Sequence, residues 1–411
     1  MKGSSAQSSR PTRGAYTVLG VAAIVALGAC AGGESSGSPA VDAAATVDAA
    51  TIHDAPTPTD AASCPSGTVA CGLDCVEVAI DERHCGACDH GCGDGLACGD
   101  GHCTIAMSGD GGGRWRYRRA IAITGSIVGP QVDYVVPVVV DTRGLVEAGT
   151  LQATGADLRF AAADGIELPW WTASNVISDQ ATLWLRVPAI PVGGAIVYLY
   201  YGNPAASAGW SWNSGPRTFD FFDDFEGAAL DAQRWSAGQR YGLPTQQGGQ
   251  LAFYEWTAVN GQVDGDEVQT ARTFAGSRVA EFGLTLTLTP QPTWRSQELL
   301  VRIGAAEDVS TAATAQVVAG WWSNGARDCA PANGVYAGRA QVDAAAGRYR
   351  LYLGSTLCAE KPLAATSAPY VFNVAIEGGW GWTALDLAGF RVRAFADPEP
   401  LAGPPGAEEV L

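Results

Sequence analysis

From residue 114 onward the chain consists of short β-branched and aromatic runs separated by turn residues. Residues 134–140, 181–187 and 195–201 are three such runs. Residues 284–289 alternate strictly between leucine and threonine, as a half-buried antiparallel strand must. Apolar positions at helical spacing are scarce. This pattern predicts an all-β body built as antiparallel sandwiches.

Eight cysteines lie in the segment just before this body. Glycine and aspartate fill most of the gaps between them, so the segment has little apolar core of its own. An exported chain meets an oxidising compartment, so we expect disulfides to stabilise this segment. Spacing alone does not determine which cysteines pair. We therefore expect a disulfide-rich module over residues 64–103, formed by Cys64, Cys71, Cys75, Cys85, Cys88, Cys92, Cys98 and Cys103.

A zinc site is the alternative for the same cysteines. Cys85 and Cys88 have the two-residue spacing of zinc ligands, and His84, His90 and His102 lie beside cysteines. The order of cysteine and histidine, however, fits no zinc-finger spacing. An export signal upstream also favours disulfides over the metal.

That signal occupies residues 1–29. Lys2, Arg10 and Arg13 precede an apolar stretch over residues 15–29, which as a helix is about 22 Å long against a hydrocarbon core of about 30 Å. The stretch therefore predicts an export signal rather than a membrane span.

The end of this signal, Leu27-Gly28-Ala29-Cys30, resembles the lipobox of bacterial lipoproteins. The resemblance implies cleavage before Cys30, lipidation of its sulfur, and, with Ala31 in place of aspartate, passage to the outer membrane. An ordinary secretory signal is the alternative. Residues 30–63, rich in Ala, Ser, Thr, Pro and Asp, predict a disordered stalk, and the Gly-rich residues 104–113 predict a linker.

The next segment resembles an exported bacterial family, domain of unknown function 2341. The resemblance rests on Trp115-Arg116-Tyr117, Asp157-Leu158-Arg159-Phe160, Leu168-Pro169-Trp170-Trp171, and above all Tyr200-Tyr201-Gly202-Asn203-Pro204. It covers about residues 114–206 and implies a β domain with no assigned chemistry. We expect the first sandwich over residues 114–215.

A second resemblance begins at Phe221-Phe222-Asp223-Asp224-Phe225-Glu226-Gly227. This stretch is similar to the first strand of concanavalin-like, or laminin-G-like, jelly rolls, and Phe390-Arg391-Val392-Arg393 resembles their closing strand. The resemblance implies a jelly-roll domain over residues 216–405, a fold shared by lectins and glycan-cleaving enzymes. A disordered tail is expected over residues 406–411.

Cys329 and Cys358 flank a predicted hairpin made of residues 334–342 and 347–354. In an oxidising compartment we expect them to form a disulfide, which would contribute roughly 3.5 kcal/mol by closing its loop. Two free buried thiols are the alternative.

Charge and histidine content exclude several classes of function. The chain has 42 Asp and Glu against 25 Lys and Arg, and without the leader the net charge is 22 − 42 = −20. A nucleic-acid partner is therefore not expected. All four histidines precede residue 104, so the body holds no Ser–His–Asp site and no His-ligated zinc.

Carboxylates are the remaining candidates for chemistry. Asp223, Asp224 and Glu226 lack the alternating acidic spacing of glycan-cleaving jelly rolls, so we interpret them as turn-capping residues. Asp264, Asp266 and Glu267 are interpreted as a solvated acidic turn, with a calcium contact as the alternative. No catalytic residue and no obligatory cofactor is predicted.

The tryptophans give the best indication of binding. Exposed indoles suit the C–H faces of sugars, whereas buried ones are sandwich core. Trp380 and Trp382 lie among glycines, and Trp321 and Trp322 are adjacent, so these four are the candidate ligand platforms. We expect a non-catalytic, lipid-anchored surface protein that binds glycan or another surface ligand. The alternatives are a polysaccharide hydrolase or lyase and a purely structural envelope or adhesion component.

Overall fold

The computed structural model describes residues 64–411 except residues 73, 93–95, 237–241, 255, 258–262, 289–296, 306–312, 323–327, 364–368 and 379–382. The expected leader, Cys30 and the expected stalk lie outside the described residues. None of the helices in the described part of the chain has the length and hydropathy needed to cross a membrane.

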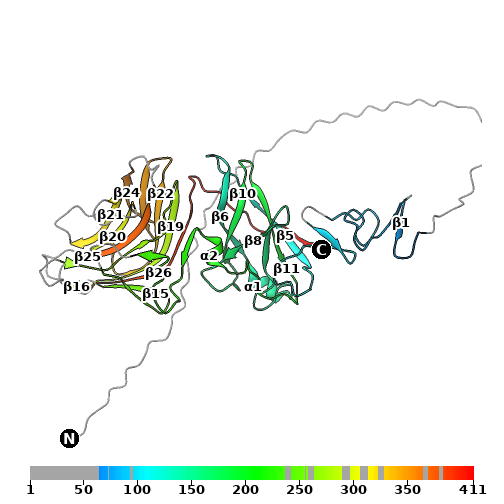
Figure 1. The fold of residues 1–411 in the computed structure, drawn as a ribbon, viewed down its shortest axis with the longest axis horizontal. Helices are drawn as coiled ribbons and strands as arrows, with labels where there is room; N and C mark the ends of the chain where they lie inside the picture. The colour runs from blue at the N-terminus through cyan, green and yellow to red at the C-terminus, as the bar shows by residue number, and fades with distance from the viewer. Residues whose placement is uncertain are drawn as a thin grey trace, which may run out of the picture. The chain divides into compact units, whose positions relative to one another are not determined.

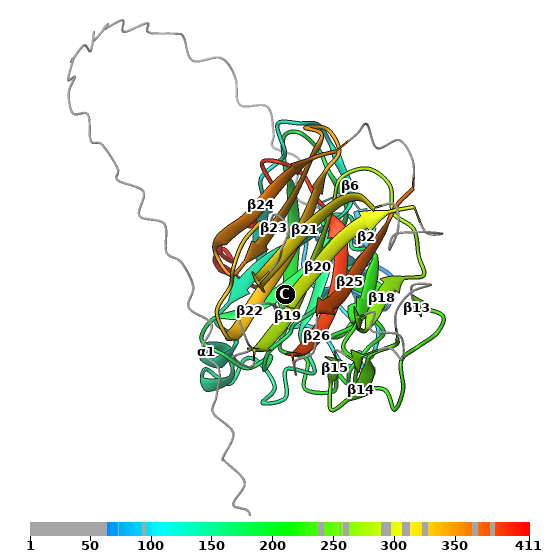
Figure 2. The same cartoon turned by 90° about the vertical axis from the view of Figure 1, so that its left-hand side faces the viewer.

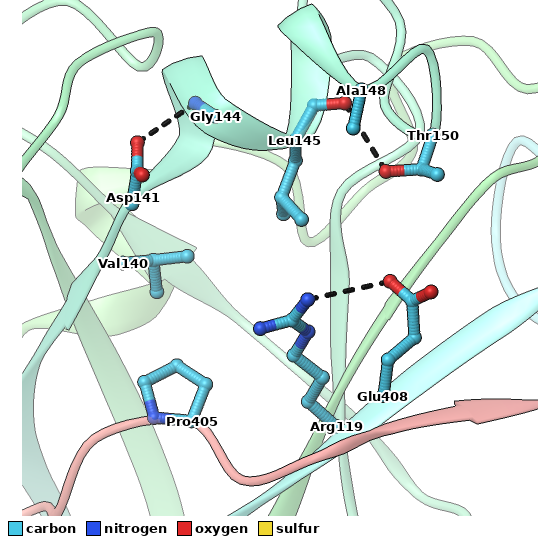
Figure 3. Close-up of a pocket in the computed structure, with 9 residues that line it drawn as sticks. All are labelled: Arg119, Val140, Asp141, Gly144, Leu145, Ala148, Thr150, Pro405 and Glu408. Carbon is cyan, nitrogen blue, oxygen red and sulfur yellow. Dashed lines mark hydrogen bonds and ion pairs between the residues drawn. The ribbon is translucent and has the colours of Figure 1, made fainter.

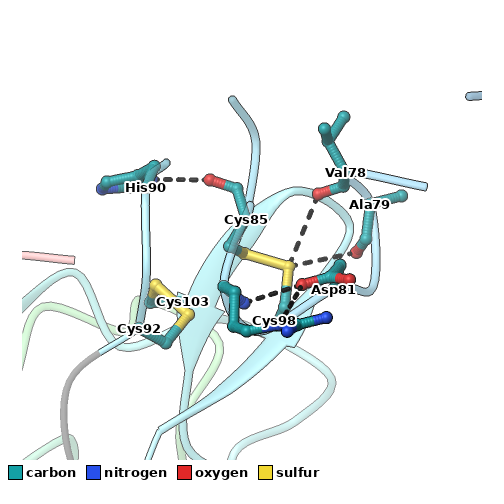
Figure 4. Close-up of a disulfide and its surroundings, with 9 residues drawn as sticks. Val78, Ala79, Asp81, Cys85, His90, Cys92, Cys98 and Cys103 are labelled. Carbon is teal, nitrogen blue, oxygen red and sulfur yellow. Dashed lines mark hydrogen bonds and ion pairs between the residues drawn. A yellow bond between two sulfur atoms is a disulfide. The ribbon is translucent and has the colours of Figure 1, made fainter. Parts of the chain in front are cut away.

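The cysteine-rich module consists of two small hairpins held by four disulfides. Its strands are β1 (Val69–Cys71), β2 (Asp74–Val76), β3 (Ala97–Gly99) and β4 (His102–Thr104). The bonds join Cys64 to Cys75, Cys71 to Cys88, Cys85 to Cys98 and Cys92 to Cys103. Figure 4 shows the last two bonds side by side. All eight sulfurs are thus engaged with one another, which confirms the expected disulfide module.

The Gly-rich stretch after the module is packed against the first sandwich rather than free. The Arg159 guanidinium donates to the Ser108 carbonyl at 2.9 and 3.1 Å, and Glu167 accepts from the Ser108 amide and hydroxyl. A Cβ at Gly111 would lie 2.2 Å from the Ala205 carbonyl oxygen. The glycines here permit close backbone contact.

The first sandwich consists of a three-stranded and a five-stranded antiparallel sheet. Their orders are β6-β10-β9 and β27-β5-β11-β7-β8. Apolar residues that alternate along the strands, such as Tyr134, Val136 and Val138, form the core between the sheets. The elements are β5 (Tyr117–Ile123), β6 (Gln131–Val140), α1 (Thr142–Glu147), β7 (Arg159–Ala162), β8 (Glu167–Leu168), β9 (Trp170–Trp171), β10 (Ala181–Ile190), β11 (Ala195–Tyr201), α2 (Gly215–Thr218) and β27 (Glu408–Val410).

The C-terminal strand β27 corrects one expectation. Residues 406–411 are not a disordered tail, because β27 pairs antiparallel with β5 and completes the five-stranded sheet. Backbone hydrogen bonds from Thr124 to Leu401 and from Gly403 to Ala122 extend the contact. The expectation was wrong because the partner strand lies almost 300 positions earlier in the chain, where no local pattern in the tail can indicate it.

The second domain is a jelly roll of two antiparallel sheets, as expected. The larger sheet has the order β14-β15-β26-β19-β22-β23-β24, with β12 also on β26, and the smaller has the order β13-β18-β25-β20-β21. Figure 1 shows this domain, and Figure 2 shows β22, β19 and β26 running side by side.

Strands of the larger sheet are β12 (Phe221–Asp223), β14 (Thr245–Gln247), β15 (Gln250–Tyr254), β19 (Arg278–Leu288), β22 (Gly334–Asp343), β23 (Arg348–Leu353), β24 (Thr356–Pro362) and β26 (Thr383–Ala394). Those of the smaller sheet are β13 (Trp235–Ser236), β18 (Glu267–Thr270), β20 (Gln297–Gly304), β21 (Ala313–Trp322) and β25 (Val371–Gly378). A separate hairpin pairs β16 (Trp256–Thr257) with β17 (Val263–Asp264).

The alternating leucines of β19 face the core of the jelly roll, as their spacing predicts. Leu284 and Leu286 are buried between the sheets with Phe282. The expected hairpin is β22 and β23, and the disulfide between Cys329 and Cys358 is formed.

An ion cluster lies on the outer face of the larger sheet. Glu281 of β19 accepts from Arg391 at 2.8 Å and from Arg393 at 3.0 Å, and Arg393 also pairs with Glu399. The Arg391 guanidinium lies over the Trp171 ring of the first sandwich, 5.2 Å from its centroid. Burial opposes ionisation of Glu281, but Arg393 and Arg391 outweigh it and lower its pKa to about 2.

Glu281 therefore links stability to acid pH. A carboxyl with a depressed folded pKa contributes stability above its unfolded pKa of 4.5, and this contribution is lost as the pH falls toward about 2. We predict that Glu281→Gln lowers the free energy of unfolding at neutral pH by about 3 kcal/mol. Chemical denaturation at several acid pH values should also show that the free energy of unfolding of the variant falls less with decreasing pH than that of the wild type. Glu360→Gln is the control, because Glu360 forms an exposed pair with Arg350. Equal acid limbs in the wild type and Glu281→Gln would contradict the assignment.

Candidate functional site

The outer face of the smaller jelly-roll sheet carries a set of polar side chains that we call the five-strand face. Its members are Glu267 and Gln269 of β18, Asn373 of β25, and Glu298 and Arg302 of β20. Their neighbours in sequence, such as Val268, Val301 and Val374, point into the core. Strand alternation therefore places all five polar side chains on the opposite face.

Strand register brings these residues together. Gln269 pairs with Asn373, and Asn373 pairs with Arg302, so the three form a row across β18, β25 and β20. Gln316 of β21 is the next position in this row. The row brings side chains far apart in the sequence within hydrogen-bonding reach.

The centre of the five-strand face is a buried ion pair. Arg302 is 1% exposed, Glu267 is fully buried, and the Arg302 Nη1 lies 3.7 Å from the Glu267 Oε1. The Asn373 side-chain amide donates to the same carboxylate. A buried charge pair requires such further hydrogen bonds to offset desolvation, and Asn373 supplies one to Glu267.

Glu298 is the partly exposed acid of this face. On β20 its side chain lies on the same face as Leu300, two residues later, and Arg302, four residues later. Burial raises the pKa of Glu298, and the positive charge of Arg302 opposes the rise. The face therefore combines a carboxyl that retains its proton more readily than usual with a buried guanidinium on the same strand.

Two of the four candidate tryptophan platforms, Trp321 and Trp322, are the last residues of β21 in this sheet. Trp322 at the end of β21 pairs with Gln297 at the start of β20, which also pairs with Gly378 at the end of β25. The backbone of Trp321 lies in the same strand. The side chains of Trp321 and Trp322, and the whole of Trp380 and Trp382, lie outside the described residues.

Most of the other tryptophans are structural. Trp115, Trp170 and Trp235 are buried, and Trp170 and Trp171 point to opposite faces of their sheet, as adjacent residues on a strand do. Trp210 is the exposed one among the described indoles, and Arg217 lies over its ring.

The candidate calcium residues do not point to one place. Asp266 accepts a hydrogen bond from the Tyr254 amide at 2.8 Å, whereas Glu267 faces Arg302 and Asn373. The side chain of Asp264 lies outside the described residues. Within the described part of the chain the only triad of potential metal ligands is Cys85, Cys92 and Cys103, and disulfides engage all three.

The acids of the Phe221–Asp223 strand and its turn act as capping residues. Asp223 is buried and accepts from the Phe225 amide at 2.9 Å and from the Trp235 indole at 2.7 Å. Asp224 accepts from the Glu226 amide. These contacts fix the entry of the first jelly-roll strand, in agreement with the interpretation of the sequence.

Sequence reasoning missed most of the five-strand face. The sequence predicts Glu267 as part of a solvated acidic turn, with a calcium contact as the alternative, and this prediction is wrong because Glu267 is buried in β18. No pattern in the sequence assigns a role to Gln269, Glu298, Arg302 or Asn373. One sequence pattern does indicate two of these residues, because Arg302 and Asn373 interrupt the apolar stretches 299–303 and 370–376. Polar residues inside such stretches are unusual unless they are paired.

Two protein families match parts of the chain. The domain of unknown function 2341 matches residues 154–238, which confirms the first resemblance. The stigma-specific STIG1-like protein family matches residues 51–106, which include the disulfide module. No curated protein matches the chain.

Solved structures with some likeness include several jelly rolls named for glycan chemistry. A pseudo β-1,3-glucanase of Mycobacterium tuberculosis is 11% identical, with 44% of this chain and all of that chain covered and a TM-score of 0.33. The catalytic domain of a laminarinase from Thermotoga petrophila is 11% identical, with 42% and 96% covered and a TM-score of 0.28. The Emp46p carbohydrate recognition domain is 9% identical, with 41% and 94% covered and a TM-score of 0.30.

The raised pKa of Glu298 predicts a stabilising substitution. An acid whose folded pKa exceeds its unfolded value costs stability as the pH rises above the unfolded value of 4.5. We expect Glu298→Gln to be at least as stable as the wild type at neutral pH and to lose less stability than the wild type between acid and neutral pH. Chemical denaturation at both pH values measures this difference. Marked destabilisation at neutral pH would show that the ionised carboxylate is held by favourable contacts.

Proposed function

We propose that the chain is an exported, lipid-anchored surface protein whose jelly roll binds neutral glycan at the five-strand face. The observation that carries this proposal is that Glu298 and Gln316, both partly exposed, lie at the margin of a buried row of amide and guanidinium groups across β18, β25 and β20. The Glu298 carboxyl accepts hydrogen bonds and the Gln316 amide both donates and accepts them, as recognition of sugar hydroxyls requires.

Two features of the sequence support a sugar ligand at this place. Trp321 and Trp322 are the last residues of β21, and Trp380 and Trp382 follow β25 in the sequence. Indoles provide apolar surfaces for sugar rings. The net charge of −20 without the leader repels anionic polymers. We therefore favour a neutral glycan.

Cysteine use supports the anchor. Ten of the 11 cysteines form the five disulfides, and Cys30 of the lipobox-like run is the remaining one. Disulfides are typical of an exported chain, and two or more acyl chains at Cys30 would hold it stably on a membrane. The proposed location is the outer membrane.

The second candidate function is glycan hydrolysis, and the raised pKa of Glu298 favours it. A general acid needs such a carboxyl, and Glu267 is a second carboxylate on the same face. Release of reducing ends from a bound polysaccharide, lost in Glu298→Gln, would establish hydrolysis in place of binding alone.

We predict that substitutions at the margin of the five-strand face weaken glycan binding. Glu298→Gln and Gln316→Ala should each raise the Kd for a retained polysaccharide by about tenfold, which corresponds to one hydrogen bond. Affinity electrophoresis in gels containing β-glucan, mannan or xylan measures the effect on the full chain. Arg339→Met is the matched control, because Arg339 lies over Tyr352 on the larger sheet. Retention of no polysaccharide, or equal retention of all variants, would contradict the proposal.

Lipidation is tested separately. We expect the chain expressed in a Gram-negative host to incorporate radiolabelled palmitate and to fractionate with the outer membrane. Cys30→Ala should lose the label and leave the membrane fraction, because no other cysteine follows the signal run within the stalk. A labelled Cys30→Ala variant, or an unlabelled wild type, would contradict the anchor.

A further inference from the structure

A cavity of about 490 Å³ lies at the open side of the first sandwich. Its lining comes from β5, from the end of β6, from α1 with the turn after it, and from the C-terminal segment (Figure 3). β6 is an edge strand of the three-stranded sheet, and β27 beside β5 is the edge of the other sheet. The cavity therefore lies where the two sheet edges face each other.

Charged side chains occupy core-facing positions at this edge. Along β5, Ile121 and Ile123 point between the sheets, and alternation places Arg119 on the same side. Glu408 pairs with Arg119 in register, so it also points inward from β27. A sandwich core normally continues with apolar residues at such positions, so this inward ion pair breaks the pattern.

The ion pair is ordered by a buried tyrosine. Arg119 donates from Nε to the Tyr201 hydroxyl at 2.7 Å and from Nη2 to Glu408 at 3.4 Å, and the Tyr201 hydroxyl donates to Glu408. The side chains of Arg119 and Glu408 are each about one-third exposed, at 31% and 32%. Both charged groups are thus fixed in position and still reach the cavity.

The facing wall is mostly aliphatic. Val140, Leu145 and Ala148 line it, and Pro405 lies on the C-terminal segment on the side of Arg119, as Figure 3 shows. The polar side chain of Thr150 bonds to the Leu145 carbonyl. Another lining carboxylate, Asp141, accepts from the Gly144 amide at 2.8 Å. The cavity thus has the Arg119–Glu408 ion pair on one side and a largely aliphatic wall with one carboxylate, Asp141, on the other (Figure 3).

We propose that this cavity binds a small neutral polyhydroxylated ligand, such as a single sugar residue. Each sugar hydroxyl both donates and accepts hydrogen bonds. The Arg119 guanidinium offers donors and the adjacent Glu408 carboxylate offers an acceptor, so the pair can bind two neighbouring hydroxyls. The aliphatic wall fits the C–H face of the ring. A volume of about 490 Å³ lies in the range of small-molecule sites. This site is separate from the five-strand face and does not depend on it.

The C-terminal segment completes the site. Pro405 and Glu408 both belong to the last seven residues, so the cavity has its full lining only while β27 is paired with β5. A second ion pair, Arg118 with Glu409 at 2.7 Å, lies on the opposite face of the same two strands. This pair helps to hold β27 and does not line the cavity.

The two ion pairs provide a matched experiment on the full chain. Binding of mannose, galactose and N-acetylglucosamine is measured by isothermal titration calorimetry and saturation-transfer NMR, with leucine as a zwitterionic probe. At least one sugar should bind the wild type, and Glu408→Gln should weaken that binding about tenfold because a charged acceptor becomes neutral. Glu409→Gln should bind as the wild type does.

A second variant tests the cavity without altering its charges. Ala148 is exposed at the end of α1, so Ala148→Trp fills the cavity without disturbing the core. We expect it to abolish the component of sugar binding that Glu408→Gln weakens, whereas Arg339→Met on the larger jelly-roll sheet leaves that component intact. The proposal is overturned if no sugar binds the wild type, if leucine binds in place of sugars, or if Glu408→Gln and Ala148→Trp bind as the wild type does.

Discussion

The pairing of Glu281 with Arg391 and Arg393 is the interaction on which the arrangement of the body most depends. Both arginines project from β26, the strand that pairs with β12, β15 and β19 in the larger jelly-roll sheet. Charges on the outer face of a sheet normally remain in water. Here they are covered by Trp171 and Trp184 of the first sandwich. A guanidinium tolerates this environment because it stacks on aromatic rings while it binds a carboxylate.

The same strand leads directly into the C-terminal segment. After β26 the chain passes Glu399, which accepts from Arg393 and from the Tyr134 hydroxyl of the first sandwich. It then runs along β5 and ends as β27. The first sandwich is therefore completed by residues that follow the jelly roll. A chain cut between the two domains would lack one sheet edge and one wall of the Arg119 cavity, so the domains are not independent modules.

Both candidate sites have the same physical origin. At the five-strand face and in the Arg119 cavity, strand alternation places charged or amide side chains on a covered face, and neighbouring strands supply their partners. Arg302 with Glu267, and Arg119 with Glu408, are both pairs from distant parts of the chain. Desolvation makes such pairs costly unless they are well bonded. Both proposals of ligand recognition rest on these two pairs.

The all-β class, the disulfide module and the jelly-roll hairpin with its disulfide can be predicted from the amino-acid sequence, because strand alternation and cysteine chemistry are local signals. Asp223 as a turn cap and the split of Trp170 and Trp171 between two faces follow from the same local rules. Three features follow from the three-dimensional fold instead: the pairing of the cysteines, the pairing of residues 408–410 with β5, and the contact of Glu267 with Arg302 and Asn373. These contacts depend on sheet register between segments tens to hundreds of residues apart, and register is set by the packing of the whole domain rather than by any single strand.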